Sequence, residues 1–309
     1  MGILEKLKRF KKTKEKEPKI KEQKKHYKVG LALGGGGTRG FAHLGALRAF
    51  EEEGISFDYI SGTSVGSLVA ALYASGMSAE EMIEKAKELR VKDIRTSKLP
   101  FVPSKTEKLE EVMKEYIGDL VFSDLKKPLT VVAVDLISAK EVHIESGSVI
   151  KAVAGSCAVP AVFSPVEYEP YLLVDGGVQN TIPSDVLKNK GCKYIIAIDV
   201  NPARGYGTKS TKIIDVVAAS IRIMMKANAE KGKMYADIVI SPDTKRFKST
   251  RVEGGLELIE EGYRATMDAM PQIKKLLKIK AKTKNKKWFN KNKQSIIKDT
   301  VITENVIEE

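Results

Sequence analysis

Cysteine is scarce in this chain. The 309 residues include two cysteines, Cys157 and Cys192, and their spacing fits neither a metal-ligand motif nor a disulfide framework. We therefore expect two core thiols and a reducing compartment. The cytoplasm is the predicted location.

Long apolar runs are also missing. No stretch approaches the roughly 20 residues that cross a bilayer, and the basic N-terminus has no apolar core of signal-peptide length. Gly2 follows Met1, but Lys6 stands where a myristoylation signal has Ser or Thr. We expect a protein that is not exported by a signal peptide, does not span the membrane and is not myristoylated.

Acidic residues are outnumbered by basic ones at the two ends of the chain. Residues 1–28 hold 12 Lys or Arg against four Glu, and residues 271–298 hold 11 Lys and no acid, whereas residues 29–270 are close to neutral. This distribution predicts a basic N-terminal extension (1–28), one domain (29–270) and a basic C-terminal extension (271–309). Two strongly basic ends indicate an anionic partner.

Apolar residues within the basic ends favour a membrane surface over nucleic acid. Near the N-terminus they form one stripe of a short interfacial helix, and a second basic run contains Trp288 and Phe289. The stripe consists of Ile3, Leu4, Leu7 and Phe10. The alternative is a pair of solvated tails. Nucleic-acid binding is disfavoured because the body is nearly neutral and no known binding module is recognised.

Strand-like and helix-like segments alternate along residues 29–270, which predicts a three-layer α/β/α fold with a mostly parallel central sheet. The expected strands are 27–34, 57–61, 128–137, 140–146, 166–177, 193–200 and 236–241, and the expected helices include 40–54, 78–90, 105–118, 148–159, 183–191, 213–231 and one from about 254 onward.

The segment GTSVG, residues 62–66, follows a predicted strand and opens a predicted helix. Gly62 and Gly66 allow a sharp turn and close helix packing, so Ser64 would stand exposed at a helix N-terminus as in a GxSxG nucleophile elbow. The alternative is that Ser64 caps the helix with its side chain.

Histidine is scarce as well, and this restricts the base that could activate Ser64. The three histidines are His26, His43 and His143, so the α/β-hydrolase order of Ser, acid and late His is excluded. His26 lies in the basic arm, and we expect His43 to be packed and His143 to be structural or exposed.

A carboxylate remains as the candidate base. Asp175 ends an apolar strand and is followed by Gly176 and Gly177, so we expect it at the same sheet edge as Ser64. The alternative is that this Asp-Gly pair only forms a turn.

A third motif, LALGGGGTRG (residues 31–40), places four consecutive glycines between a strand and a helix. Their backbone amides, with Arg39 and the helix N-terminus, could bind an anion, which in acyl transfer is the tetrahedral oxyanion. The alternative is a dinucleotide fingerprint, because Gly35, Gly37 and Gly40 match GxGxxG. Against this alternative, Asp58 lies at the start of the second strand, whereas a ribose-binding acid should lie at its end. A P-loop is excluded because no Lys-Ser or Lys-Thr closes the glycine run.

The motifs GGGGTRG, GTSVG and DGG, in this order, resemble those of the patatin-like phospholipases, in particular the compact bacterial branch. The resemblance covers about residues 29–241. It implies Ser64 as nucleophile, Asp175 as its partner in a Ser-Asp dyad, and Gly35, Gly36 and Gly37 as the oxyanion region. Plant members begin the first motif with Asp where this chain has Gly34, so a plant-type substrate preference does not follow.

The family also implies the reaction, which is hydrolysis of acyl esters of phospholipids or other acylglycerols without a metal or an organic cofactor. Asp175 would accept the Ser64 proton directly, and burial should raise its pKa. Together with the basic ends, this predicts a cytoplasmic enzyme attached peripherally to the inner face of the membrane. The alternatives are a Rossmann-type dinucleotide-binding protein and a catalytically inactive membrane-surface adaptor.

Overall fold

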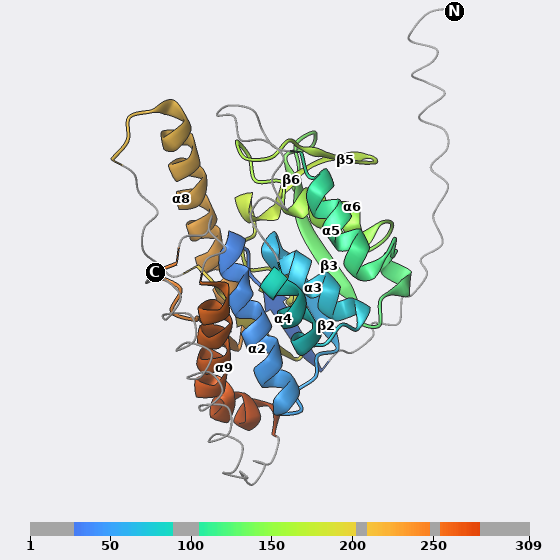
Figure 1. Cartoon of the computed structure of the whole chain (residues 1–309), viewed down its shortest axis with the longest axis vertical. Coiled ribbons are helices and arrows are strands. Elements are labelled where there is room, and N and C mark those ends of the chain that lie inside the picture. The colour runs from blue at the N-terminus through green and yellow to red at the C-terminus, as the bar shows by residue number, and fades with distance from the viewer. Residues whose placement is uncertain (1–27, 89–104, 202–208, 248–253, 279–309) are drawn as a thin grey trace, which may run out of the picture.

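The computed structural model describes residues 28–88, 105–201, 209–247 and 254–278 (Figure 1). The predicted N-terminal apolar stripe, His26, Trp288 and Phe289 lie outside these residues.

The described residues contain an eight-stranded mixed sheet. Strands β3, β2, β1, β7 and β8 run parallel at its centre, and β5 and β6 extend it in antiparallel fashion beyond β3, which also pairs with β4. The bounds are β1 Val29–Leu33, β2 Tyr59–Thr63, β3 Leu129–Asp135, β4 Lys140–Ile144, β5 Val166–Tyr168, β6 Tyr171–Asp175, β7 Tyr194–Ile198 and β8 Ile238–Ile240. The predicted mostly parallel sheet is confirmed.

Helices cover both faces of this sheet. Along β1, Leu31 and Leu33 belong to the larger core cluster, whereas Ala32 belongs to a second cluster on the other face. The larger cluster includes side chains of α2, α3, α4, α5, α6 and α9, and the smaller one includes side chains of α7 and α8. Apolar side chains on both sides of the strands fit a sheet that is buried on both faces, and the predicted three layers are confirmed.

The α-helices of the described residues lie close to the predicted ranges. Their bounds are α2 Phe41–Glu52, α3 Val65–Ser75, α4 Ala79–Glu88, α5 Glu107–Ile117, α6 Val149–Ser156, α7 Ser184–Asn189, α8 Ile213–Lys233 and α9 Gly255–Leu277. Short 3-10 turns at Gly37–Gly40 (η1), Phe122–Asp124 (η3) and Gly176–Val178 (η4) complete the list.

The last helix packs along α2 and continues past residue 270 to Leu277 (Figure 1). Ile273 and Leu277 are buried in the larger cluster, so the folded body extends beyond Pro271. The division of the chain into a domain with two basic extensions remains a prediction. Among the described helices, none combines the length and apolar character needed to cross a membrane.

Candidate active site

Ser64 lies at the turn between β2 and α3, as the GTSVG motif predicts, but the residue is buried, with 6% of its surface exposed, where the prediction had it exposed. Its backbone has φ 53° and ψ −131°, a conformation that is rare for a residue other than glycine. The side chain makes no capping hydrogen bond to α3, so the capping alternative is not what the structure shows. A strained backbone and a hydroxyl that does not cap the helix are the features of a nucleophile elbow.

The two glycines of the motif allow the elbow to pack tightly. A Cβ atom on Gly66 would lie 2.1 Å from the carbonyl oxygen of Leu33, and one on Gly62 would lie 2.6 Å from the carbonyl oxygen of Gly66. Because real Cβ atoms do not approach backbone so closely, only glycine allows α3 to begin directly beside the end of β1.

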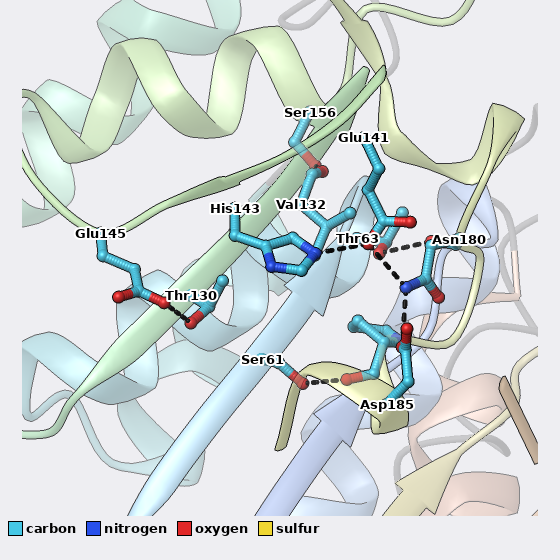
Figure 2. A network of polar contacts seen from close by, with 11 residues as sticks. Ser61, Thr63, Thr130, Val132, Glu141, His143, Glu145, Ser156, Asn180 and Asp185 are labelled. Atoms are coloured by element: carbon cyan, nitrogen blue, oxygen red, sulfur yellow. Dashed lines mark hydrogen bonds and ion pairs between the residues drawn. The ribbon is translucent and has the colours of Figure 1, made fainter. Parts of the chain in front are cut away.

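Ser156, on α6, fixes the backbone of the nucleophile. The amide of Ser64 donates to Ser156 Oγ over 2.8 Å, and this hydroxyl donates to the carbonyl oxygen of Val132 over 2.6 Å. Figure 2 shows the bond from Ser156 to Val132 on β3. No role was predicted for Ser156, which lies in the predicted helix 148–159.

Asp175 lies at the level of the elbow. In the sheet, Thr63 is paired with Val132 and Asp175 with Ala133. Because Val132 and Ala133 are adjacent on β3, Ser64, the residue after Thr63, lies level with Asp175. The prediction assumed that Asp175 ends a strand pointing the same way as β2. In the structure β6 runs antiparallel to β3 and reaches this level because β3 extends beyond the end of β2.

The carboxyl group of Asp175 is fully buried. Its Oδ1 accepts a hydrogen bond from the amide of Gly177 over 2.7 Å, while its Oδ2 has no hydrogen-bond partner among the described residues. Burial raises the pKa of Asp175 to about 6, against the opposing effects of the Ser64 hydroxyl and the Gly177 amide. Ser64 is therefore close enough to affect this carboxyl group, although the two make no hydrogen bond of ordinary geometry.

Asn180 joins the loop after Asp175 to the strand before Ser64. Thr63 Oγ1 donates to the carbonyl oxygen of Asn180 over 2.8 Å, and Asn180 Nδ2 donates to Glu141 Oε1 and to Asp185 Oδ1 (Figure 2). Gly176 and Gly177 form the turn η4 between Asp175 and this anchor. The Asp-Gly pair is thus a turn as well as the end of a buried strand.

Neither described histidine forms a pair with Ser64. His143 on β4 lies 2.6 Å from Glu141 Oε1 (Figure 2), and this hydrogen bond raises the pKa of the imidazole. His43 on α2 is fully buried, and burial lowers its pKa to about 4, so the ring is neutral. Its Nε2 lies 2.8 Å from the carbonyl oxygen of Gly34, which assigns the proton to Nε2. The expected packed role of His43 is confirmed.

The glycine loop lies against the elbow. A Cβ atom on Gly35 would be 3.3 Å from Ser64 Cβ, but the amide of Gly35 donates to the carbonyl oxygen of Thr181 over 3.0 Å. For the amides of Gly36 and Gly37, no backbone acceptor occurs among the described residues. These two are therefore the better oxyanion candidates of the three predicted glycines.

Arg39 and Asn201 hold the other side of this loop. Arg39 Nε donates to the carbonyl oxygen of Phe247 and its Nη1 to Asn201 Oδ1, while Asn201 Nδ2 donates to the carbonyl oxygen of Gly35 over 2.7 Å. These contacts give Arg39 a structural role in the loop. Gly40 packs on the elbow, since a Cβ atom there would lie 2.2 Å from a methyl carbon of Val65.

Cys157 borders the same site, whereas Cys192 is buried in the smaller cluster as expected. Burial and the charge of Asp175 raise the pKa of the Cys157 thiol, and the hydroxyls of Ser67 and Ser64 act in the opposite direction. The position of Cys157 beside Asp175 and Ser64 was not predicted. Among the described residues, no three His, Cys, Asp or Glu side chains form a group that could hold a metal ion.

Residues 31–188 match the family model for patatin-like phospholipases. This stretch is more than half of the chain and contains the glycine loop, the elbow and the Asp175 loop. The chain belongs to the patatin-like phospholipase family.

Several relatives from this family are similar over a shorter part of their length. An uncharacterized NTE family protein of Mycobacterium tuberculosis is 32% identical over 178 residues, which are 56% of this chain and 49% of that protein. Neuropathy target esterase sws of Drosophila melanogaster is 34% identical over 184 residues, 56% of this chain and 13% of that protein. The chain therefore matches about half of the mycobacterial relative and a small part of the fly protein.

Among solved structures, VipD from Legionella pneumophila is similar at a TM-score of 0.49 and 16% identity, covering 80% of this chain and 67% of VipD. Human GIVD cytosolic phospholipase A2 is similar at a TM-score of 0.43 and 13% identity, covering 81% of this chain and 59% of that one.

Family membership and Asp58 together argue against the dinucleotide alternative for this patatin-like chain. Asp58 precedes β2, and its Oδ2 accepts hydrogen bonds from the amides of Lys28 and Val29. This carboxylate is therefore hydrogen-bonded to the backbone at the start of β1, whereas a ribose-binding acid would lie at the end of the second strand.

Proposed function

We propose that this protein hydrolyses carboxylic esters of lipids, with Ser64 as nucleophile and Asp175 as the base that accepts its proton. The observation that supports this most directly is the buried Oδ2 of Asp175, which has no hydrogen-bond partner among the described residues. It belongs to a carboxyl group that is close enough to Ser64, at the strained elbow, for the serine to affect its pKa. A fully buried carboxylate with an unused oxygen is energetically costly, and titratable groups perturbed in this way are concentrated at functional sites.

In the proposed reaction, Ser64 Oγ attacks the ester carbonyl carbon while its proton passes to Asp175 Oδ2. The carbonyl oxygen becomes an oxyanion, to which the amides of Gly36 and Gly37 donate. The C–O bond to the alcohol breaks, and Asp175 returns the proton to the leaving oxygen. Water then attacks the acyl-enzyme with Asp175 again as base, releasing the fatty acid and restoring Ser64.

The lipid nature of the substrate is supported by the family and by the charge of the chain. The matching family is one of phospholipases, and a formal net charge of +13 favours a surface of anionic lipid. We further propose that the enzyme works in the cytoplasm and attaches peripherally to the membrane, with its basic ends as part of the attachment.

Covalent labelling by a fluorophosphonate probe tests the proposal, with hydrolysis of a soluble p-nitrophenyl ester as the second measurement. Wild type should be labelled and active, Ser64→Ala should lose both properties, and Asp175→Asn should lose at least about a hundredfold in rate, as removal of a general base does. Ser184→Ala is the matched control, because Ser184 is also fully buried and its hydroxyl has no partner among the described residues.

Labelling that persists in Ser64→Ala would contradict the proposed nucleophile. A wild type that neither reacts with the probe nor hydrolyses esters, even with anionic vesicles present, would contradict the hydrolase function and favour an inactive surface adaptor.

A further inference from the structure

Helix α8 has an apolar face that the described part of the chain leaves largely uncovered. Five of its apolar side chains are between 42% and 82% exposed, namely Ile213, Val216, Val217, Ile223 and Met224. Their spacing of three, four, ten and eleven residues from the first places them in one stripe of the helix. Figure 1 shows half of α8 projecting from the edge of the molecule, clear of the other helices.

The opposite side of α8 is hydrogen-bonded to the loop that follows Asp175, residues 176–181. Thr181 Oγ1 donates to the carbonyl oxygen of Met225 over 2.7 Å, and Asn228 Nδ2 donates to that of Val178 over 2.6 Å. Further along the helix, Ala229 is buried in the smaller core cluster. The exposed stripe therefore belongs to a helix that is anchored directly to the loop after Asp175.

A second exposed apolar pair lies across the same loop. Leu136 and Ile137, in the turn between β3 and β4, are 50% and 72% exposed. Gln179 Nε2 donates to the carbonyl oxygen of Ala139 in this turn over 3.0 Å. The loop from Asp175 to Thr181 thus has exposed apolar side chains on both sides, from segments far apart in the sequence.

The charged residues of the first part of α8, and of the segment just before it, are mostly basic. Residues 209–228 contain one acid, Asp215, and four basic residues, namely Lys209, Lys212, Arg222 and Lys226. An apolar stripe with basic neighbours is the pattern of helices that lie in the interface of an anionic bilayer.

We propose that the α8 stripe and the β3–β4 turn form the face with which this protein docks on an anionic lipid bilayer, beside the active site. The inference rests on the proposed lipid hydrolase function, since docking there would bring the Ser64–Asp175 site to the lipid surface. Apolar side chains enter the bilayer interface in this arrangement, and the neighbouring cations contact lipid phosphates.

Flotation of the full chain with phosphatidylcholine vesicles containing phosphatidylglycerol tests the docking face. All proteins carry Ser64→Ala, so that binding is measured without hydrolysis and independently of the proposed chemistry. The stripe variant combines Ile213→Ser, Val217→Ser and Met224→Ser. The matched control combines Val121→Ser, Met234→Ser and Tyr235→Ser, three exposed apolar residues that precede β3 or β8 at the opposite edge of the sheet.

Binding is compared at low salt and at about 0.5 M salt, where screening weakens contacts of exposed charges, including those of the basic ends. The part of vesicle binding that persists at high salt should be at least about tenfold weaker for the stripe variant than for its parent, because this part comes from burial of apolar surface, which does not depend on charge. The control should bind as its parent does. Thermal unfolding of each variant shows whether it is folded.

Three results would overturn the docking face. These are unchanged salt-resistant binding of the folded stripe variant, an equal loss in the control, and a parent that is dimeric in solution while the stripe variant is monomeric. The last result would assign the stripe to a second copy of the chain. Because the Ser64→Ala parent lacks the proposed nucleophile, none of these results depends on whether the wild type is a lipid hydrolase.

Discussion

Asp175 lies level with Ser64 although its strand runs opposite to the strand that leads to Ser64. Thr63 on β2 pairs with Val132, and Asp175 on β6 pairs with the next residue of β3, Ala133. The extra length of β3 beyond β2 is what allows an antiparallel strand to end beside the elbow.

Asp175→Asn should stabilise the protein at neutral pH. Burial raises the pKa of Asp175 from 3.8 to about 6, so the folded state binds the proton more tightly than the unfolded state does. The free energy of unfolding therefore decreases as pH rises from about 4 to about 6, and the full cost, up to about 3 kcal/mol, applies above this range. Asparagine keeps an oxygen to accept from the Gly177 amide and cannot ionise.

Urea unfolding of wild type and Asp175→Asn at pH 4 and pH 8 measures this effect. The stability difference should be small at pH 4 and favour the variant at pH 8. An equal difference at both pH values would show that ionisation of Asp175 is not its cause.

The acylation rate should follow the same ionisation. Only the carboxylate form of Asp175 can accept the Ser64 proton, so the single-turnover rate on a soluble ester should rise with pH and level off above an apparent pKa of about 6. Stopped-flow measurement of the acylation burst between pH 4.5 and pH 8.5 is the test. A rate that does not change across this range would argue against Asp175 as the base.

The fold and the candidate residues Ser64 and Asp175 could be predicted from the sequence, because both depend on local patterns. Apolar strands, helix periodicity and the three glycine motifs are readable in one stretch each. These motifs indicated Ser64 and Asp175 as candidates, and the family resemblance implied their roles as nucleophile and base. The strand direction of β6 was not readable, because it depends on the pairing of Asp175 with Ala133, a contact between distant segments.

The supporting hydrogen bonds could not be predicted for the same reason. Nothing in the local sequence of Ser156 shows that it accepts from the Ser64 amide, and nothing near Gly35 shows that its amide donates to Thr181. Likewise, the apolar residues of α8 read as an ordinary core helix until their exposure is known.

Ser156→Ala should lower both stability and activity, whereas Ser184→Ala should change little. Both serines are fully buried, but the Ser156 hydroxyl joins the Ser64 amide to the Val132 carbonyl, and the Ser184 hydroxyl has no partner among the described residues. Loss of the Ser156 hydroxyl leaves a buried amide and a buried carbonyl unpaired, which costs about 1–3 kcal/mol.

Chemical unfolding and probe-labelling rates of the two variants provide the comparison. Ser156→Ala should also be labelled more slowly, because the strained backbone of Ser64 loses a fixed contact. If both variants behave alike, the hydrogen bond from Ser64 to Ser156 does not hold the elbow.

His43 should act as a positioning residue for the glycine loop, although it touches no substrate atom. Its Nε2 donates to the carbonyl oxygen of Gly34, next to the glycines that would bind the oxyanion. His43→Ala should lower kcat on a soluble ester by up to about a hundredfold with little change in KM, because small displacements of catalytic groups are that costly. His43→Gln can place an amide donor near the position of Nε2 and should recover part of the loss.

The pH dependence of stability tests whether His43 is held neutral in the folded protein. The folded protein holds the pKa of His43 at about 4, below the ordinary 6.5, so the neutral ring contributes stability that is lost as pH falls from about 6.5 to about 4. His43→Gln should remove this dependence while keeping more of kcat than His43→Ala does. If both variants lose kcat equally, the bond to Gly34 does not position the loop. If both retain the wild-type dependence of stability on pH, ionisation of His43 is not its cause.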